Sequence, residues 1–140
     1  MKFWDSSALV PLLVFETARE KLLDLLESDG ELIVWWGAPV ECVSAIARRE
    51  RAGDMELIAA NDAIRRLRAI GPTWIEVSPS LQVRNLAERL LRVHTLRAAG
   101  SLQLAAALVA SERNPEVLGF VCLDDRLSDA ARREGFDVLP

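Results

Sequence analysis

Three acidic residues, Asp5, Glu41 and Asp124, occupy positions where an α/β sheet would place chemistry. Asp5 directly follows a short apolar segment, Met1–Trp4, and Asp124 directly follows another, Phe120–Leu123. Glu41 lies in the first turn of a predicted helix that comes after a third apolar segment. If these segments are parallel strands, their carboxyl ends lie at one edge of the sheet, and acids from distant parts of the chain meet there.

Such a set of acids would suit a hard divalent cation. Mg²⁺ and Mn²⁺ prefer oxygen ligands, and Mg²⁺ keeps several waters when one or two carboxylates hold it. A bound cation can polarise a phosphate, turn water into a nucleophile near neutral pH and stabilise the leaving oxygen. Each acid also has a purely structural explanation, because Asp5 and Asp124 are good helix N-caps and Glu41 suits the first turn of a helix. The convergence of three favours metal-dependent hydrolysis.

The apolar pattern predicts strands that alternate with helices. The expected strands are Met1–Trp4, Glu31–Trp36, Trp74–Val77, Leu118–Leu123 and Phe136–Leu139. The expected helices are Ser6–Val14 with Pro11 in its first turns, Thr17–Ser28, Pro39–Arg51, one that Asp54 caps and that ends before Gly71, one that begins at Pro79 and runs to Val93, Arg97–Glu112, and Asp125–Glu134. This alternation predicts an α/β protein with a mostly parallel central sheet that helices cover on both faces.

Composition limits the class of protein. The 140 residues suit a single domain spanning positions 1–140, and the apolar fraction of 51% is sufficient for a core. The net charge of −4 argues against a general polyanion binder. Neither a signal peptide nor a membrane-spanning run is recognisable, so we expect a cytoplasmic protein. Cys42 and Cys122 lack metal-site spacing and are expected to be buried free thiols.

Four segments, taken in chain order, resemble the successive motifs of PIN domains and are most similar to the VapC-type toxins of bacterial toxin–antitoxin pairs. They are Phe3–Leu9, Pro39–Ala45, Leu96–Ala105 and Leu123–Leu127, and together with their spacing they cover essentially the whole chain. The resemblance implies a three-layer α/β/α fold and a ribonuclease that depends on Mg²⁺ or Mn²⁺. It also implies a homodimer, and an antitoxin that covers the acidic groove.

The resemblance assigns roles to individual residues. Asp5, Glu41 and Asp124 match acidic positions of the family's active site. Asp5 and Asp124 are expected to hold the metal ion, while Glu41 orients or deprotonates water. Ser6 matches a small hydroxylated position that can help to hold metal-bound water, and Asp125 is a neighbouring acid that could reach the same site.

One position departs from the family pattern, since Gly100 stands where an Asp is expected. Three explanations remain open. Water, together with Ser101 or Asp125, fills the gap in a slower nuclease; the protein is an inactive relative that binds RNA or an antitoxin without cleavage; or the residue is an introduced substitution. We expect impaired metal binding under each of them.

The basic residues Arg48, Arg49 and Arg51 end one predicted helix and have two interpretations. They complement the negative end of the helix dipole, or they guide RNA phosphates toward the acids. Several other classes are excluded by what the sequence lacks. A receiver domain needs a late Lys, and no Lys follows Lys21. An Asp-x-Asp phosphatase needs an acid at Ser7, and neither a phosphate-binding loop nor a zinc ligand set occurs.

Overall fold

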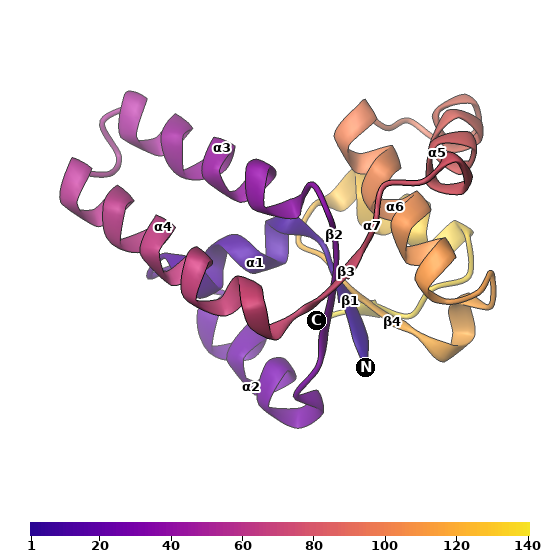
Figure 1. The fold of residues 1–140 in the computed structure, drawn as a ribbon, viewed down its shortest axis with the longest axis horizontal. Helices are drawn as coiled ribbons and strands as arrows, with labels where there is room; N and C mark the ends of the chain where they lie inside the picture. Colours follow the sequence, from indigo (N-terminus) through magenta and orange to yellow (C-terminus); the bar gives the residue numbers. More distant parts are fainter.

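The computed structural model describes residues 1–140 and contains a five-stranded parallel sheet between two layers of helices (Figure 1). The strands are β1 (Lys2–Trp4), β2 (Leu32–Trp35), β3 (Ile75–Val77), β4 (Gly119–Val121) and β5 (Val138–Leu139). Their order is β3-β2-β1-β4-β5, and every pairing is parallel. The predicted α/β/α architecture is therefore confirmed.

The helices divide between the two faces. The first face carries α1 (Ser6–Leu13), α2 (Arg19–Asp29), α3 (Ala38–Arg51) and α4 (Leu57–Ile70), and the other carries α5 (Leu81–Val93), α6 (Ala98–Ala110) and α7 (Asp125–Arg133) (Figure 1). Short 3₁₀ turns at Gly71–Thr73 and Pro115–Val117 precede β3 and β4. None of these helices is long and apolar enough to span a membrane.

Alternation along the strands explains why both faces are covered. Phe3 belongs to the core under α5, α6 and α7, and Trp4 belongs to the core under the other four helices. In β2, Ile33 and Trp35 join the first of these cores, and Leu32 and Val34 join the second. A strand buried on both sides needs apolar residues at successive positions, which is the pattern of this chain.

The strand order creates a switch point beside β1. The chain first moves outward from β1 to β2 and β3, and then returns across the sheet to place β4 on the other side of β1. Connections that leave a sheet in opposite directions open a crevice at the carboxyl ends of the strands between them. Asp5, after β1, and Asp124, after β4, flank this crevice.

Two details of the predicted helices were wrong. Asp54 does not cap α4, because Gly53 adopts a φ of 81° and the Asp54 amide donates to the carbonyl of Arg49, so these residues form the turn between the helices. Pro79 does not begin α5, whose N-cap is Ser80. Pro11 lies in the second turn of α1, in agreement with its expected place in the first turns of this helix. The expectation of buried free thiols at Cys42 and Cys122 is confirmed.

Candidate active site

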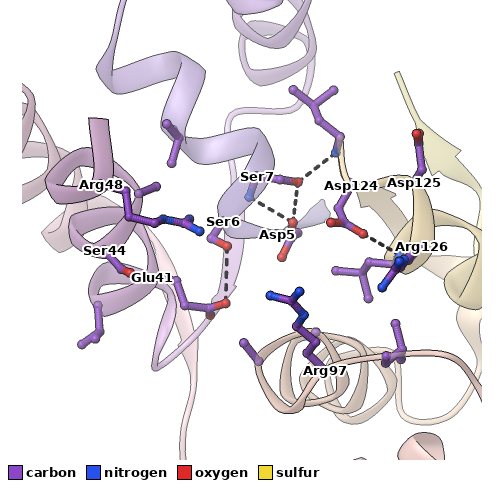
Figure 2. Close-up of a pocket in the computed structure, with 18 of the residues that line it drawn as sticks. Asp5, Ser6, Ser7, Glu41, Ser44, Arg48, Arg97, Asp124, Asp125 and Arg126 are labelled. Atoms are coloured by element: carbon purple, nitrogen blue, oxygen red, sulfur yellow. Dashed lines mark hydrogen bonds between the residues drawn. The ribbon is translucent and has the colours of Figure 1, made fainter. Parts of the chain in front are cut away.

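One cavity of about 960 Å³ at the carboxyl edge of the sheet brings the predicted site residues together (Figure 2). We call it the acid cavity. Its polar and charged lining comprises Asp5, Ser6, Ser7, Glu41, Ser44, Arg48, Thr95, Arg97, Asp124, Asp125 and Arg126. Gly100 also lines it. Of the three arginines predicted at the end of α3, only Arg48 reaches the cavity, because Arg49 forms an ion pair with Glu16 and Arg51 is exposed at the helix end.

Asp5 lies at the base of the acid cavity, with 3% of its surface exposed. It is the N-cap of α1, and its Oδ2 accepts a hydrogen bond from the amide of Ser7 (3.0 Å). The same oxygen accepts from Oγ of Ser7 (2.5 Å) and from Sγ of Cys122 (3.6 Å). Burial raises the pKa of Asp5, and the hydrogen bonds from Ser7 and Cys122 offset part of that effect.

Ser7 connects the two loops that carry Asp5 and Asp124. Its Oγ donates to Asp5 and accepts a hydrogen bond from the amide of Leu123 (2.9 Å), directly before Asp124. From the sequence, Ser7 served only to exclude an Asp-x-Asp phosphatase, which needs an acid at this position. The sequence carries no signal for this bridge, because Leu123 lies 116 residues away from Ser7 along the chain.

Glu41 projects from α3 toward the same edge and is held by two side chains. Nε2 of Gln103 donates to its Oε2 (2.6 Å), and Oγ of Ser6 donates to its Oε1 over a longer 3.5 Å. Burial, together with the negative charge of Asp5, raises the pKa of Glu41 to about 7. Glu41 is therefore a carboxyl group that can both release and accept a proton at neutral pH.

Gln103 was missed by sequence reasoning. It is fully buried in α6, and its Oε1 has no hydrogen-bond partner. The signal was its position as the one polar residue in the run Leu102–Val109, since a buried amide requires a polar partner across the packing interface.

Asp124 is both a helix cap and a cavity residue. Its Oδ1 accepts from the amide of Leu127 (2.8 Å) at the start of α7, and its side chain is exposed to the cavity with that of Asp125. The capping interpretation is thus correct for Asp5 and Asp124. It does not exclude a role of the same residues in a metal site, because each keeps a carboxylate oxygen that the cap does not use. Glu41 caps no helix.

Gly100 is the third residue of α6, whose first turn carries no acid and no side-chain cap. A Cβ built on Gly100 would lie 3.7 Å from Cδ2 of Leu96 and 3.9 Å from Cδ1 of Leu127, which are ordinary contacts. Packing therefore leaves room for a side chain at this position, and the glycine is not imposed by the fold.

The donor set fits a hard cation in part. The cavity acids form no ion pair with Arg or Lys, so their charge is not neutralised within the chain. Asp5 and Asp124 use Oδ2 and Oδ1, respectively, for their hydrogen bonds, which leaves one oxygen of each available. No group of three or more acidic, His or Cys side chains is close enough to hold a metal ion. Asp5 and Asp124 can therefore each supply one carboxylate oxygen, with water as the remaining ligands. Mg²⁺ accepts such a ligand set.

Two further cationic residues of the acid cavity, Arg97 and Arg126, were not predicted. Arg97 is the N-cap residue of α6, and Arg126 lies in the first turn of α7. Figure 2 shows the guanidinium of Arg97 extending toward the acids from the side opposite α1. Nothing in the sequence around these arginines separates them from the other arginines of the chain.

Comparison with known proteins supports the fold. No protein-family model and no curated protein matches the chain. Among solved structures, it is similar to a chain of a toxin–antitoxin complex from Klebsiella pneumoniae, with a TM-score of 0.66 and 13% identity. It is also similar to FitAcB from Neisseria gonorrhoeae, with a TM-score of 0.68 and 14% identity. Each match covers 100% of this chain and 97% of the other. At these identities the likeness establishes a shared fold.

The Ser7→Ala substitution tests the link between the two loops. It removes a donor to a buried carboxylate and an acceptor for the Leu123 amide, so we expect a loss of about 1.5–3 kcal/mol in the free energy of unfolding. Ser6→Ala is the matched control, because its single 3.5 Å contact predicts a loss of less than about 1 kcal/mol. Urea denaturation measures both. Equal losses for the two variants would contradict the bridging role of Ser7.

The raised pKa of Glu41 predicts a pH-dependent effect of Glu41→Gln. Between the ordinary glutamate pKa of 4.5 and about 7, folded Glu41 binds more protons than unfolded Glu41, so its contribution makes the protein less stable as pH rises through this range. Glu41→Gln should therefore be more stable than the wild type above pH 7, and this advantage should shrink as pH falls toward 4.5. Urea denaturation across pH measures it, and an advantage that is independent of pH would be the contrary result.

Proposed function

We propose that this protein is a divalent-metal-dependent endoribonuclease of the PIN type and the toxin of a toxin–antitoxin pair. The observation that carries the proposal is the convergence of Asp5, Glu41 and Asp124 in one cavity at the switch point of the sheet. The sequence motifs support the assignment, and so does the structural likeness to a chain of a toxin–antitoxin complex and to FitAcB. An antitoxin and a second copy of the chain are the proposed protein partners.

The residues divide the chemistry between them. Asp5 and Asp124 would hold Mg²⁺ or Mn²⁺, with Asp125 as a nearby acid and Ser6 beside the first ligand. The cation, when bound, would supply a site for an activated water and for the charge of the scissile phosphate. Glu41 has the pKa of a general base near neutral pH and would take a proton from water, while Gln103 holds one of its oxygens in place.

A second candidate function follows from Gly100. With no carboxylate at this position, the cavity lacks a cluster of three acids that could hold a cation together. A PIN-like domain in this state could bind RNA or an antitoxin without cleaving. Cleavage experiments separate the two functions directly.

Cleavage of a single-stranded RNA in Mg²⁺ is the first test of the proposed activity. We expect cleavage that EDTA abolishes and that Asp5→Asn lowers by at least roughly a hundredfold, since a first acid of the metal site is lost while Asn still caps α1. Asp129→Asn removes an exposed acid that pairs with Arg133 outside the cavity, and it should retain the wild-type rate. RNA that is bound but left intact by the wild type would favour the non-enzymatic function.

Replacing Gly100 tests whether the vacant position limits metal binding. Gly100→Asp should bind Mn²⁺ roughly tenfold more tightly in calorimetric titration, because it adds a hard anionic ligand to a cavity that has room for it. Gly100→Ala is the matched control. Gly100→Ala should stabilise α6 by about 1 kcal/mol and Gly100→Asp by less, because Asp has a lower helix propensity than Ala. Only the Asp variant should bind the cation more tightly and cleave RNA faster. Equal affinities for all three proteins would show that position 100 does not limit binding.

A further inference from the structure

Three arginines, each in or next to a different helix, line the acid cavity. Arg48 belongs to α3, Arg97 precedes α6 and Arg126 belongs to α7. All three are exposed, and none has a side-chain hydrogen bond or an ion pair. In Figure 2, Arg48 lies beside Ser6, the guanidinium of Arg97 points toward Asp5, and Arg126 lies near Asp124. Guanidinium groups therefore approach the acids from several directions.

The lack of ion pairs matters because acids stand in the same cavity. Elsewhere in the chain, Arg49, Arg89 and Arg133 pair with nearby carboxylates. In the acid cavity, by contrast, the guanidinium groups and the carboxylates remain separate. Their donors are free for an external anion, and a planar guanidinium binds two oxygens of one phosphate.

We infer that Arg48, Arg97 and Arg126 bind backbone phosphates of a single-stranded RNA in the acid cavity, and that this binding does not require a divalent cation. The inference rests on the proposed function for the identity of the ligand. It divides the cavity into arginines that hold the strand and acids that serve cleavage.

The depth of the cavity favours a single strand. Asp5 is almost completely buried, so a phosphate that approaches it must enter the cavity between α1, α3 and the first turn of α6. A single strand can bend one phosphate inward while its neighbours remain near the exposed arginines. The backbone of a rigid duplex cannot follow that path. Because Gly100 has no side chain, the part of the cavity next to α6 has additional space for the strand.

Binding measured in EDTA tests the inference apart from cleavage. We would follow the fluorescence anisotropy of a labelled single-stranded RNA against the full chain over a range of salt concentrations. The wild type should bind without metal. Arg48→Gln, Arg97→Gln and Arg126→Gln should each bind roughly tenfold more weakly. In each variant the slope of log affinity against log salt should become shallower by about 0.7, the value for one lost phosphate contact on a single strand.

Arg132→Gln is the matched control. It removes the same charge from an exposed and unpaired position on α7 outside the cavity, so its affinity should stay within about twofold of the wild type. No binding by the wild type in EDTA, or equal affinities for cavity and control variants, would overturn the inference. Intact RNA in the Mg²⁺ assay, together with binding that needs the cavity arginines, would overturn the proposed nuclease function alone.

Discussion

The structure of the site depends on how the chain accommodates the buried carboxylate of Asp5. A carboxylate removed from water is strongly unfavourable unless donors replace its hydration. Here the amide and hydroxyl of Ser7 and the thiol of Cys122 converge on one oxygen. Because the Ser7 hydroxyl also accepts from the Leu123 amide, the same atom that satisfies Asp5 fixes the turn after β4. The position of Asp124 is thus linked to the hydrogen bonding of Asp5.

The strand order extends this constraint to Glu41. β1 lies at the centre of the sheet, so the loops after its two neighbours, β2 and β4, open beside Asp5. The negative charge of Asp5 is one cause of the raised pKa of Glu41. Two neighbouring acids in a partly buried site need either a proton or a cation nearby. No arginine forms an ion pair with either acid, so neither charge is neutralised by direct contact within the chain.

The elements and the convergence of acids could be predicted because they follow from local patterns. β2 is apolar at successive positions, and Asp5 and Asp124 stand at strand ends, so periodicity and parallel topology place them. The contacts that hold the acids in place could not be predicted from the sequence. The Ser7–Leu123 and Gln103–Glu41 bonds join residues far apart in sequence, and their partners depend on the relative placement of helices. The predicted start of α4 was wrong because the amide of Asp54 donates to the carbonyl of Arg49, which makes Asp54 part of the turn after α3.

The charge of the acid cavity explains how it could serve both a cation and an anion. Its four acids, Asp5, Glu41, Asp124 and Asp125, face three arginines, and the pKa of Glu41 of about 7 leaves that group partly protonated at neutral pH. The partly protonated Glu41 and the three arginines make the cavity less negative than its count of acids suggests. An Asp at position 100 would shift this balance toward negative charge beside Arg97, which favours a metal ion and opposes a phosphate that arrives without one. If the proposed function is correct, glycine at this position would lower the affinity for the cation and raise the affinity for the RNA strand.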